Sequence, residues 1–204
     1  MQVTAIEALD KSRSSVYLDG EFAFVLYKGE LRNYQIKVGE ELSEERYREI
    51  VSEVLSKRAK LRAMKLLLQR EYTTAQLREK LVQGHYPPAC IEEAMAYVAS
   101  YHYTDDVRYA VQYITLQEEK RSRRRIEQDL AGKGIARDVI EEAFAAWEAQ
   151  GGQQDEEAMI RSLLAKRKFD PQQADYAECR KQAAFLAGKG FSAEKIREIL
   201  FSFT

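Results

Sequence analysis

Apolar residues recur with the same spacing in three separate parts of the chain. The three segments read LVQGHYPPACIEEAM at 81–95, LAGKGIARDVIEEAF at 130–144 and LAGKGFSAEKIREIL at 186–200. In each segment an aromatic residue or isoleucine lies five positions after the leucine, and another isoleucine lies five positions further on. Matched spacing in three copies indicates an internal repeat, in which similar units stack along the chain.

Within each repeat the apolar positions have the period of three helices. We expect repeats at 59–104, 105–152 and 153–204. The expected helices are 59–71, 74–83 and 88–100 in the first repeat, 105–119, 123–132 and 137–149 in the second, and 155–168, 171–187 and 193–203 in the third. Gly134 and Gly190 each suit a left-handed residue that ends the middle helix, and His85 stands at the matching position of the first repeat.

Polar residues that suit N-cap positions mark the start of each middle helix. Thr73 fits the first repeat, Ser122 the second, and Asp170 the third, where Pro171 would take the first helical position. Eight residues then lead from the cap to the repeated leucine in the first two repeats, against sixteen in the third. We therefore expect an insertion of about two helical turns in the middle helix of the third repeat.

The first 42 residues have a different pattern, in which β-formers flank the pair Asp19-Gly20. This pair predicts a β-hairpin, which the alternating segment QVTAIEAL extends. A sheet this small is marginally stable by itself, so we expect it to pack on the helix that follows. Ser43 suits the N-cap of a connecting helix at 43–58, which either continues into the first repeat or joins it near Ser56.

Together these patterns predict an all-α array of tandem three-helix repeats, elongated and curved, behind a small N-terminal module containing a β-hairpin. A hydrophobic content of 45% and a charged content of 32% fit a soluble helical protein. The two cysteines have no metal-type or paired spacing, which favours reduced thiols in the cytoplasm. No signal peptide or membrane-spanning run is apparent, so we expect no membrane partner.

One cluster of basic residues surrounds the expected start of the helix 123–132, in a chain whose net charge is only −1. Its members are Lys120, Arg121, Arg123, Arg124 and Arg125. Cations at a helix N-terminus cost about 0.3–1 kcal/mol each, so their presence favours a docking site for a phosphate or a carboxylate. The alternative is a solvated basic face that nearby acids neutralise, namely Glu118, Glu119, Glu127 or Asp129.

A second basic stretch offers weaker candidates for partner contact, Lys57, Arg58 and Lys60, because helical spacing spreads them around the helix. No residue set typical of catalysis is present. The LAGKG segments lack the spacing of a phosphate-binding loop, and His85 and His102 have no Cys or Glu at metal-ligand spacing. We expect no enzymatic activity, no cofactor and no metal site.

Three segments carry a family resemblance, in the order TTAQLREKLVQGHY, YHYTDDVRYAVQYI and KRSRRRIEQDLAGKGI. Together they resemble the RecX family of bacterial regulatory proteins, over about residues 59–203, including its tandem three-helix units. Longer members of that family also carry an N-terminal extension with β structure, which fits the hairpin here.

The second of these segments places its signature at Tyr103, Asp105, Asp106, Arg108 and Tyr109. We interpret the two acids as partners of a helix N-terminus, and the two tyrosines as packing residues between repeats. We expect other tyrosines, including Tyr97 and Tyr101, to pack between helices as well, although exposed tyrosines also suit stacking on single-stranded DNA.

The resemblance implies a regulator of the recombinase RecA, which binds RecA filaments on DNA along their groove. It further implies inhibition of recombinase, ATPase and co-protease activity, with the chain acting as a monomer. One alternative is a module that binds single- or double-stranded DNA without RecA, with affinity that falls steeply with salt. Another is a helical-repeat adaptor for an unrelated protein.

Overall fold

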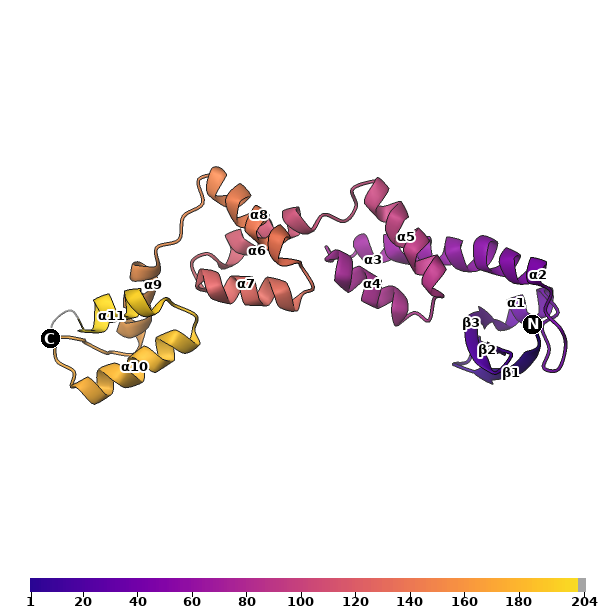
Figure 1. Cartoon of the computed structure of the whole chain (residues 1–204), viewed down its shortest axis with the longest axis horizontal. Coiled ribbons are helices and arrows are strands. Elements are labelled where there is room, and N and C mark those ends of the chain that lie inside the picture. The colour runs from indigo at the N-terminus through magenta and orange to yellow at the C-terminus, as the bar shows by residue number, and fades with distance from the viewer. Residues whose placement is uncertain (202–204) are drawn as a thin grey trace. The chain divides into compact units, whose positions relative to one another are not determined.

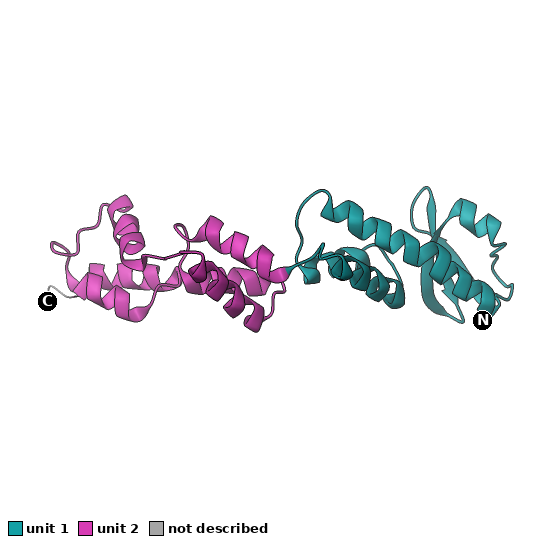
Figure 2. Cartoon of the chain, turned by 90° about the horizontal axis from the view of Figure 1, so that it is seen from above, with its two compact units in different colours: residues 1–105 teal, residues 106–204 magenta. Residues whose placement is uncertain are grey.

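The computed structural model describes residues 1–201 and is mostly helical, with one small sheet near the N-terminus (Figure 1). The chain divides into two compact units, residues 1–105 and 106–204 (Figure 2). Unit 1 contains the sheet and the first three-helix repeat, and unit 2 contains the second and third repeats. No helix among residues 1–201 combines the length and the apolar content needed to cross a membrane.

The N-terminal module is a three-stranded antiparallel meander with the order β1-β2-β3. The strands are β1 (Val3–Ala8), β2 (Arg13–Leu18) and β3 (Glu21–Tyr27), followed by the short helix α1 (Lys28–Asn33). Asp19 and Gly20 form the predicted two-residue turn, with φ of 50° and 91°, because a tight hairpin requires left-handed backbone at both positions. The expected hairpin and its extension by the first strand are confirmed.

One continuous helix leads from this module into the first repeat. It comprises α2 (Glu44–Glu49), the π-helical stretch η1 (Ile50–Ser56) and α3 (Lys57–Leu67). The Ser43 side chain accepts a hydrogen bond from the Arg46 N–H at 3.3 Å, which confirms the predicted N-cap. The backbone at Ile50 and Lys57 stays helical, so the connecting helix continues through Ser56 without a joint. The helix ends at Leu67, earlier than the predicted residue 71.

The sheet and the first repeat share a single hydrophobic core. Phe24 and Leu26 of the sheet belong to the same buried cluster as Leu55 of the long helix and Leu77 of the first repeat. Arg58 strengthens this junction through an ion pair with Glu30, which lies in α1 directly after the sheet. The predicted dependence of the β-module on the helix that follows is therefore confirmed, because the sheet has no separate core.

Each repeat contains three helices. They are α3, α4 (Thr74–Val82) and α5 (Pro88–Ser100) in the first; α6 (Asp106–Gln117), α7 (Arg123–Gly132) and α8 (Arg137–Ala149) in the second; α9 (Glu156–Lys166), α10 (Tyr176–Gly188) and α11 (Ala193–Phe201) in the third. The predicted end of the last helix at residue 203 lies outside the described residues. The second and third repeats have separate cores, which include Phe144 and Leu186 respectively.

A residue with positive φ follows the middle helix of each repeat within three positions, as the repeated sequence predicts. The φ angles are 60° at His85, 82° at Gly134 and 87° at Gly190. In the second and third repeats the next residue returns its N–H to the repeated leucine, from Ile135 to Leu130 at 3.2 Å and from Phe191 to Leu186 at 3.3 Å. These bonds satisfy carbonyls at the helix end that would otherwise lack a partner.

The predicted start of the third middle helix at Asp170 is wrong. Residues 171–173 form a turn, in which the Asp170 carboxylate accepts the Gln172 N–H at 3.0 Å. A side chain used in this way closes a local turn rather than capping a helix. The helix begins after Asp175, which forms a capping box with Glu178. Eleven residues therefore lead from Asp175 to Leu186, so the expected two-turn insertion is about one turn shorter.

Candidate partner-binding site

The start of α7 lies against the end of α10, within unit 2. Ser122 is the N-cap of α7, as predicted, and its hydroxyl accepts the Arg125 N–H at 3.3 Å. The same hydroxyl donates to the Lys189 carbonyl at 2.8 Å. Gly190 packs so closely that a Cβ there would lie 2.7 Å from the Ser122 hydroxyl oxygen. The Lys-Gly turn of the third repeat therefore sits directly on the N-terminus of α7.

This contact occupies part of the helix N-terminus at which an anion was expected to bind. Ser122 is fully buried, and its hydroxyl already accepts the Arg125 N–H. An anion therefore has to be bound by the side chains around this point. Those side chains point in different directions, because successive residues in a helix are about 100° apart.

Arg123 turns toward α8. Its guanidinium donates to Glu148 at 2.8 Å and to Glu127 at 3.2 Å, and lies 4.2 Å from the centre of the Phe144 ring. An arginine held by two carboxylates and an aromatic face is part of the packing between α7 and α8. Binding of a partner by Arg123 would compete with these contacts.

Arg121 and Arg125 converge on Asp129, whose side chain is only 15% exposed. Arg121 forms an ion pair with this carboxylate, and Arg125 approaches it at 3.4 Å. The hydrogen bond that Arg121 donates to the Asp129 carboxylate raises the pKa of Arg121. Tyr113 also donates to Asp129 at 3.3 Å, and burial, followed by the charge of Asp129, raises the pKa of this phenol. Asp129 therefore organises the basic residues on this side of α7.

A cleft of about 610 Å³ lies beside this group, between the start of α7 and the end of α10. Four cations line it, namely Lys120, Arg121, Arg125 and Lys189, together with apolar residues such as Phe185 and Phe191. No Asp or Glu among residues 1–201 lines this cleft. We call it the basic cleft. Its four cations and lack of acids suit a phosphate or a carboxylate, which arginine binds with paired hydrogen bonds.

The two interpretations of the basic run each describe part of it. Glu127 and Asp129 neutralise three of the arginines, as the solvated-face alternative requires. Glu118 serves a different purpose, since it accepts the Trp147 ring N–H at 2.8 Å. Lys120 and Arg124 make no ion pair with any described residue. Contact between these basic residues and a partner stays a prediction.

The candidates of the second basic stretch are paired within unit 1. Lys57 binds Glu53 at 2.6 Å, Lys60 binds Glu93 at 2.6 Å, and Arg58 binds Glu30 while its guanidinium lies 4.7 Å from the centre of the Tyr27 ring. Arg58 joins the β-module to the long helix, which gives it a structural task. Contact between these three residues and a partner also stays a prediction.

The signature residues occupy the turn and the helix start that separate α5 from α6. Asp106 lies in the first turn of α6, as expected for a partner of the helix dipole, and Tyr109 is half-buried against the second core. Tyr103 is 44% exposed. It stacks on Tyr101, itself 56% exposed, with ring centres 5.5 Å apart. Packing of Tyr101 and Tyr103 between helices or repeats stays a prediction.

Sequence reasoning missed Lys189, which comes 64 positions after Arg125 and lines the same basic cleft. The signal was present in the second LAGKG segment, whose lysine ends the middle helix of the third repeat. That this lysine faces the N-cap of the preceding repeat follows from the packing between repeats, which the local pattern does not contain.

Family models match all three repeats. The matches are RecX, first three-helix domain, at residues 59–97; RecX, second three-helix domain, at 105–143; and RecX, third three-helix domain, at 155–200. The Regulatory protein RecX of Caldanaerobacter subterraneus subsp. tengcongensis is 30% identical over 98% of each chain. That of Vibrio vulnificus is 34% identical over 68% of this chain and 88% of its own.

Solved structures agree with these matches. A crystal structure of regulatory protein RecX superposes with a TM-score of 0.63 at 25% identity, covering 98% of both chains. RecX from Lactobacillus salivarius shares the fold, with a TM-score of 0.57 at 18% identity over 72% of this chain and 96% of its own. The resemblance drawn from the three sequence segments is confirmed.

Proposed function

The chain belongs to the RecX family of regulatory proteins, and on that premise we propose that it binds RecA filaments along their groove and inhibits the recombinase. Inhibition would extend to the ATPase and co-protease activities of the filament, because all three depend on the same RecA–DNA assembly. The mechanism is non-covalent, and the chain acts as a monomer in the cytoplasm, where RecA filaments form.

The observation that supports this proposal is the basic cleft. A filament of protein on DNA offers phosphates and acidic side chains, and the cleft presents four cations with no acid among its described lining residues. Lys120 and Lys189 are the sharpest contacts to propose, because neither forms an ion pair with a described residue. Arg121 and Arg125 reach the same cleft while Asp129 holds them in place.

The proposal is tested by the single-stranded-DNA-dependent ATPase rate of the cognate RecA, with this protein titrated below one copy per RecA. We expect the rate to fall at low ratios, because one bound regulator silences many neighbouring protomers. Unchanged ATPase across the titration contradicts the proposed function.

The site assignment is tested by the double variant Lys120→Glu, Lys189→Glu. Its matched control is Lys166→Glu, Lys181→Glu, which makes the same charge change at exposed positions of unit 2 outside the basic cleft. We expect the first pair to lose inhibition and the second to keep it, while both keep the circular dichroism spectrum of the parent. Equal inhibition by the two double variants rejects the basic cleft as the contact.

Direct binding of DNA without RecA is the second candidate, since the basic cleft also suits phosphates of bare DNA. It predicts affinity for single-stranded DNA that falls steeply between 50 and 200 mM salt, as expected when cations displace condensed counterions, with no effect on the RecA ATPase.

A further inference from the structure

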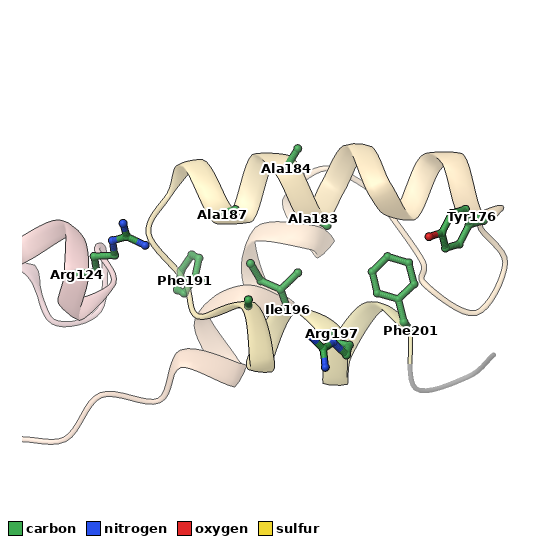
Figure 3. Close-up of a pocket in the computed structure, with 10 residues that line it drawn as sticks. Arg124, Tyr176, Ala183, Ala184, Ala187, Phe191, Ile196, Arg197 and Phe201 are labelled. Atoms are coloured by element: carbon green, nitrogen blue, oxygen red, sulfur yellow. The ribbon is translucent and has the colours of Figure 1, made fainter.

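A second cavity lies in the third repeat, where Arg124 of α7 is one of its lining residues (Figure 3). It has a volume of about 740 Å³ and runs between α10 and α11. We call it the α10–α11 groove. Most of its lining residues come from these two helices, and Arg124 of α7 joins them.

The surface of this groove is largely apolar, and on the α10 side it consists of small residues. Ala183, Ala184 and Ala187 of α10 are among its lining residues, and Ala184 and Ala187 are exposed. Side chains this small let the backbone of another segment approach closely. Tyr176, 67% exposed, packs against Phe201 with ring centres 5.7 Å apart and marks one end of the groove. Exposed apolar surface in a concave shape is typical of a binding groove.

Two arginines give the α10–α11 groove its charge. Arg124 reaches it from α7, and Arg197 from α11 (Figure 3). No Asp or Glu among the described lining residues balances them, and neither arginine makes an ion pair within residues 1–201. Arg121, Arg123 and Arg125, by contrast, all have carboxylate partners. Two guanidinium groups that no carboxylate within residues 1–201 neutralises lie beside an apolar floor, which suits a ligand with both carboxylates and apolar side chains.

We propose that the α10–α11 groove binds an acidic amphipathic helix of a partner protein. Large apolar side chains of that helix cover the alanines of α10, while its carboxylates pair with Arg124 and Arg197. This is the mode in which one face of a helix lies in an apolar groove. Nucleic acid fits this groove less well, because its phosphates would lie over the alanine floor. The inference goes beyond the proposed function, since it does not require that the partner be RecA.

A designed peptide tests the proposal without any knowledge of the natural partner. The probe is a fluorescein-labelled helical peptide of 16 residues, with leucine and phenylalanine in one stripe and glutamate on both flanks. A second peptide of the same composition, with the apolar residues scattered around the helix, has the same charge but no apolar face. We expect saturable binding of the first peptide in fluorescence anisotropy and at least tenfold weaker binding of the second.

Variants of the full chain then locate the site. Reversing both groove charges, with Arg124→Glu and Arg197→Glu, should weaken binding roughly tenfold or more, since each lost exposed ion pair is replaced by a repulsion. Ala187→Trp, at an exposed helix position, should weaken binding by filling the groove. Lys166→Glu with Lys181→Glu is again the matched control and should leave the affinity unchanged, because neither lysine lines the groove.

Three results would each overturn the proposal. One is equal binding of the two peptides, which would show attraction by charge without a groove. Another is undiminished binding by the Arg124, Arg197 and Ala187 variants. The third is concentration-dependent self-association in sedimentation that Ala187→Trp abolishes, which would make a second copy of the chain the occupant. The ATPase test with the Lys120, Lys189 variant has a different site and readout, so either proposal can fail while the other stands.

Discussion

Replacing Gly190 by alanine tests the contact between the second and third repeats. Gly190 has φ of 87°, in the region that glycine occupies without strain. Its position also leaves no space for a side chain, because an added Cβ would lie 2.7 Å from the Ser122 hydroxyl oxygen and 3.3 Å from the Arg125 backbone nitrogen. Ser122 is fully buried, so its hydroxyl can relieve the clash only by giving up its hydrogen bonds.

Two costs add up in this variant. The left-handed backbone costs alanine about 1–2 kcal/mol. Displacement of the Ser122 hydroxyl removes a helix N-cap, which costs about 0.5–2 kcal/mol more. The whole loss should be about 1.5–4 kcal/mol. Gly151 is the matched control, since it has φ of 90° and no atom within 4 Å of an added Cβ. Gly151→Ala should therefore show only the backbone cost.

Trp147 provides the assay, because it is the only tryptophan and is buried in the second core. Its fluorescence in urea follows unfolding of that repeat, where the lost N-cap acts. The midpoint should fall clearly further for Gly190→Ala than for Gly151→Ala. In a chain that already carries Ser122→Ala, the substitution of Gly190 should cost only the backbone penalty. Equal effects of the two glycine variants, or full additivity with Ser122→Ala, would refute the proposed clash.

Two further predictions concern charge and protonation. Asp129→Asn removes the charge that Arg121 and Arg125 share; because both arginines are at least 40% exposed, we expect a modest loss of about 1 kcal/mol in urea unfolding. The same variant should lower the pKa of Tyr113, measured by NMR of labelled tyrosine, and an unchanged pKa would exclude the Asp129 charge as a cause. Burial raises the pKa of the Cys90 and Cys179 thiols, so folding should disfavour both thiolates. Folding stability should then fall as pH rises above about 8.5, the ordinary thiol value, and iodoacetamide should label both cysteines slowly until urea unfolds the chain.

Most of the fold could be predicted because it depends on local sequence patterns. The turn at Asp19-Gly20, the N-caps at Ser43 and Ser122, and the left-handed residues that end the middle helices all depend on residues close in sequence. The predicted helix start at Asp170 was wrong because the local pattern offers two possible N-caps. Asp170 and Asp175 lie five residues apart, and either acid suits an N-cap. Only Asp175 is followed three residues later by a glutamate, Glu178, which completes a capping box.

The candidate site could be predicted only in part, because it depends on which side of a helix each residue faces. The run KRSRRR marks one place in the sequence, yet the structure divides it among three surroundings. Arg123 joins the packing of α8, Arg124 lines the α10–α11 groove, and Arg125 lines the basic cleft. Lys189 and Arg197 complete the last two from distant parts of the chain, through the packing of the third repeat.

Successive arginines in α7 are about 100° apart, so one compact ligand is poorly placed to contact Arg123, Arg124 and Arg125 together. A triple substitution of these three would remove a packing contact, a groove charge and a cleft charge at once, and lost inhibition could not be assigned to any one of them. Arg123→Ala should mainly lower stability, because it breaks the contacts with Glu148 and Phe144. Arg124→Ala breaks no ion pair or ring contact with the residues that the structure describes, so a loss of partner binding without a loss of stability would belong to the groove.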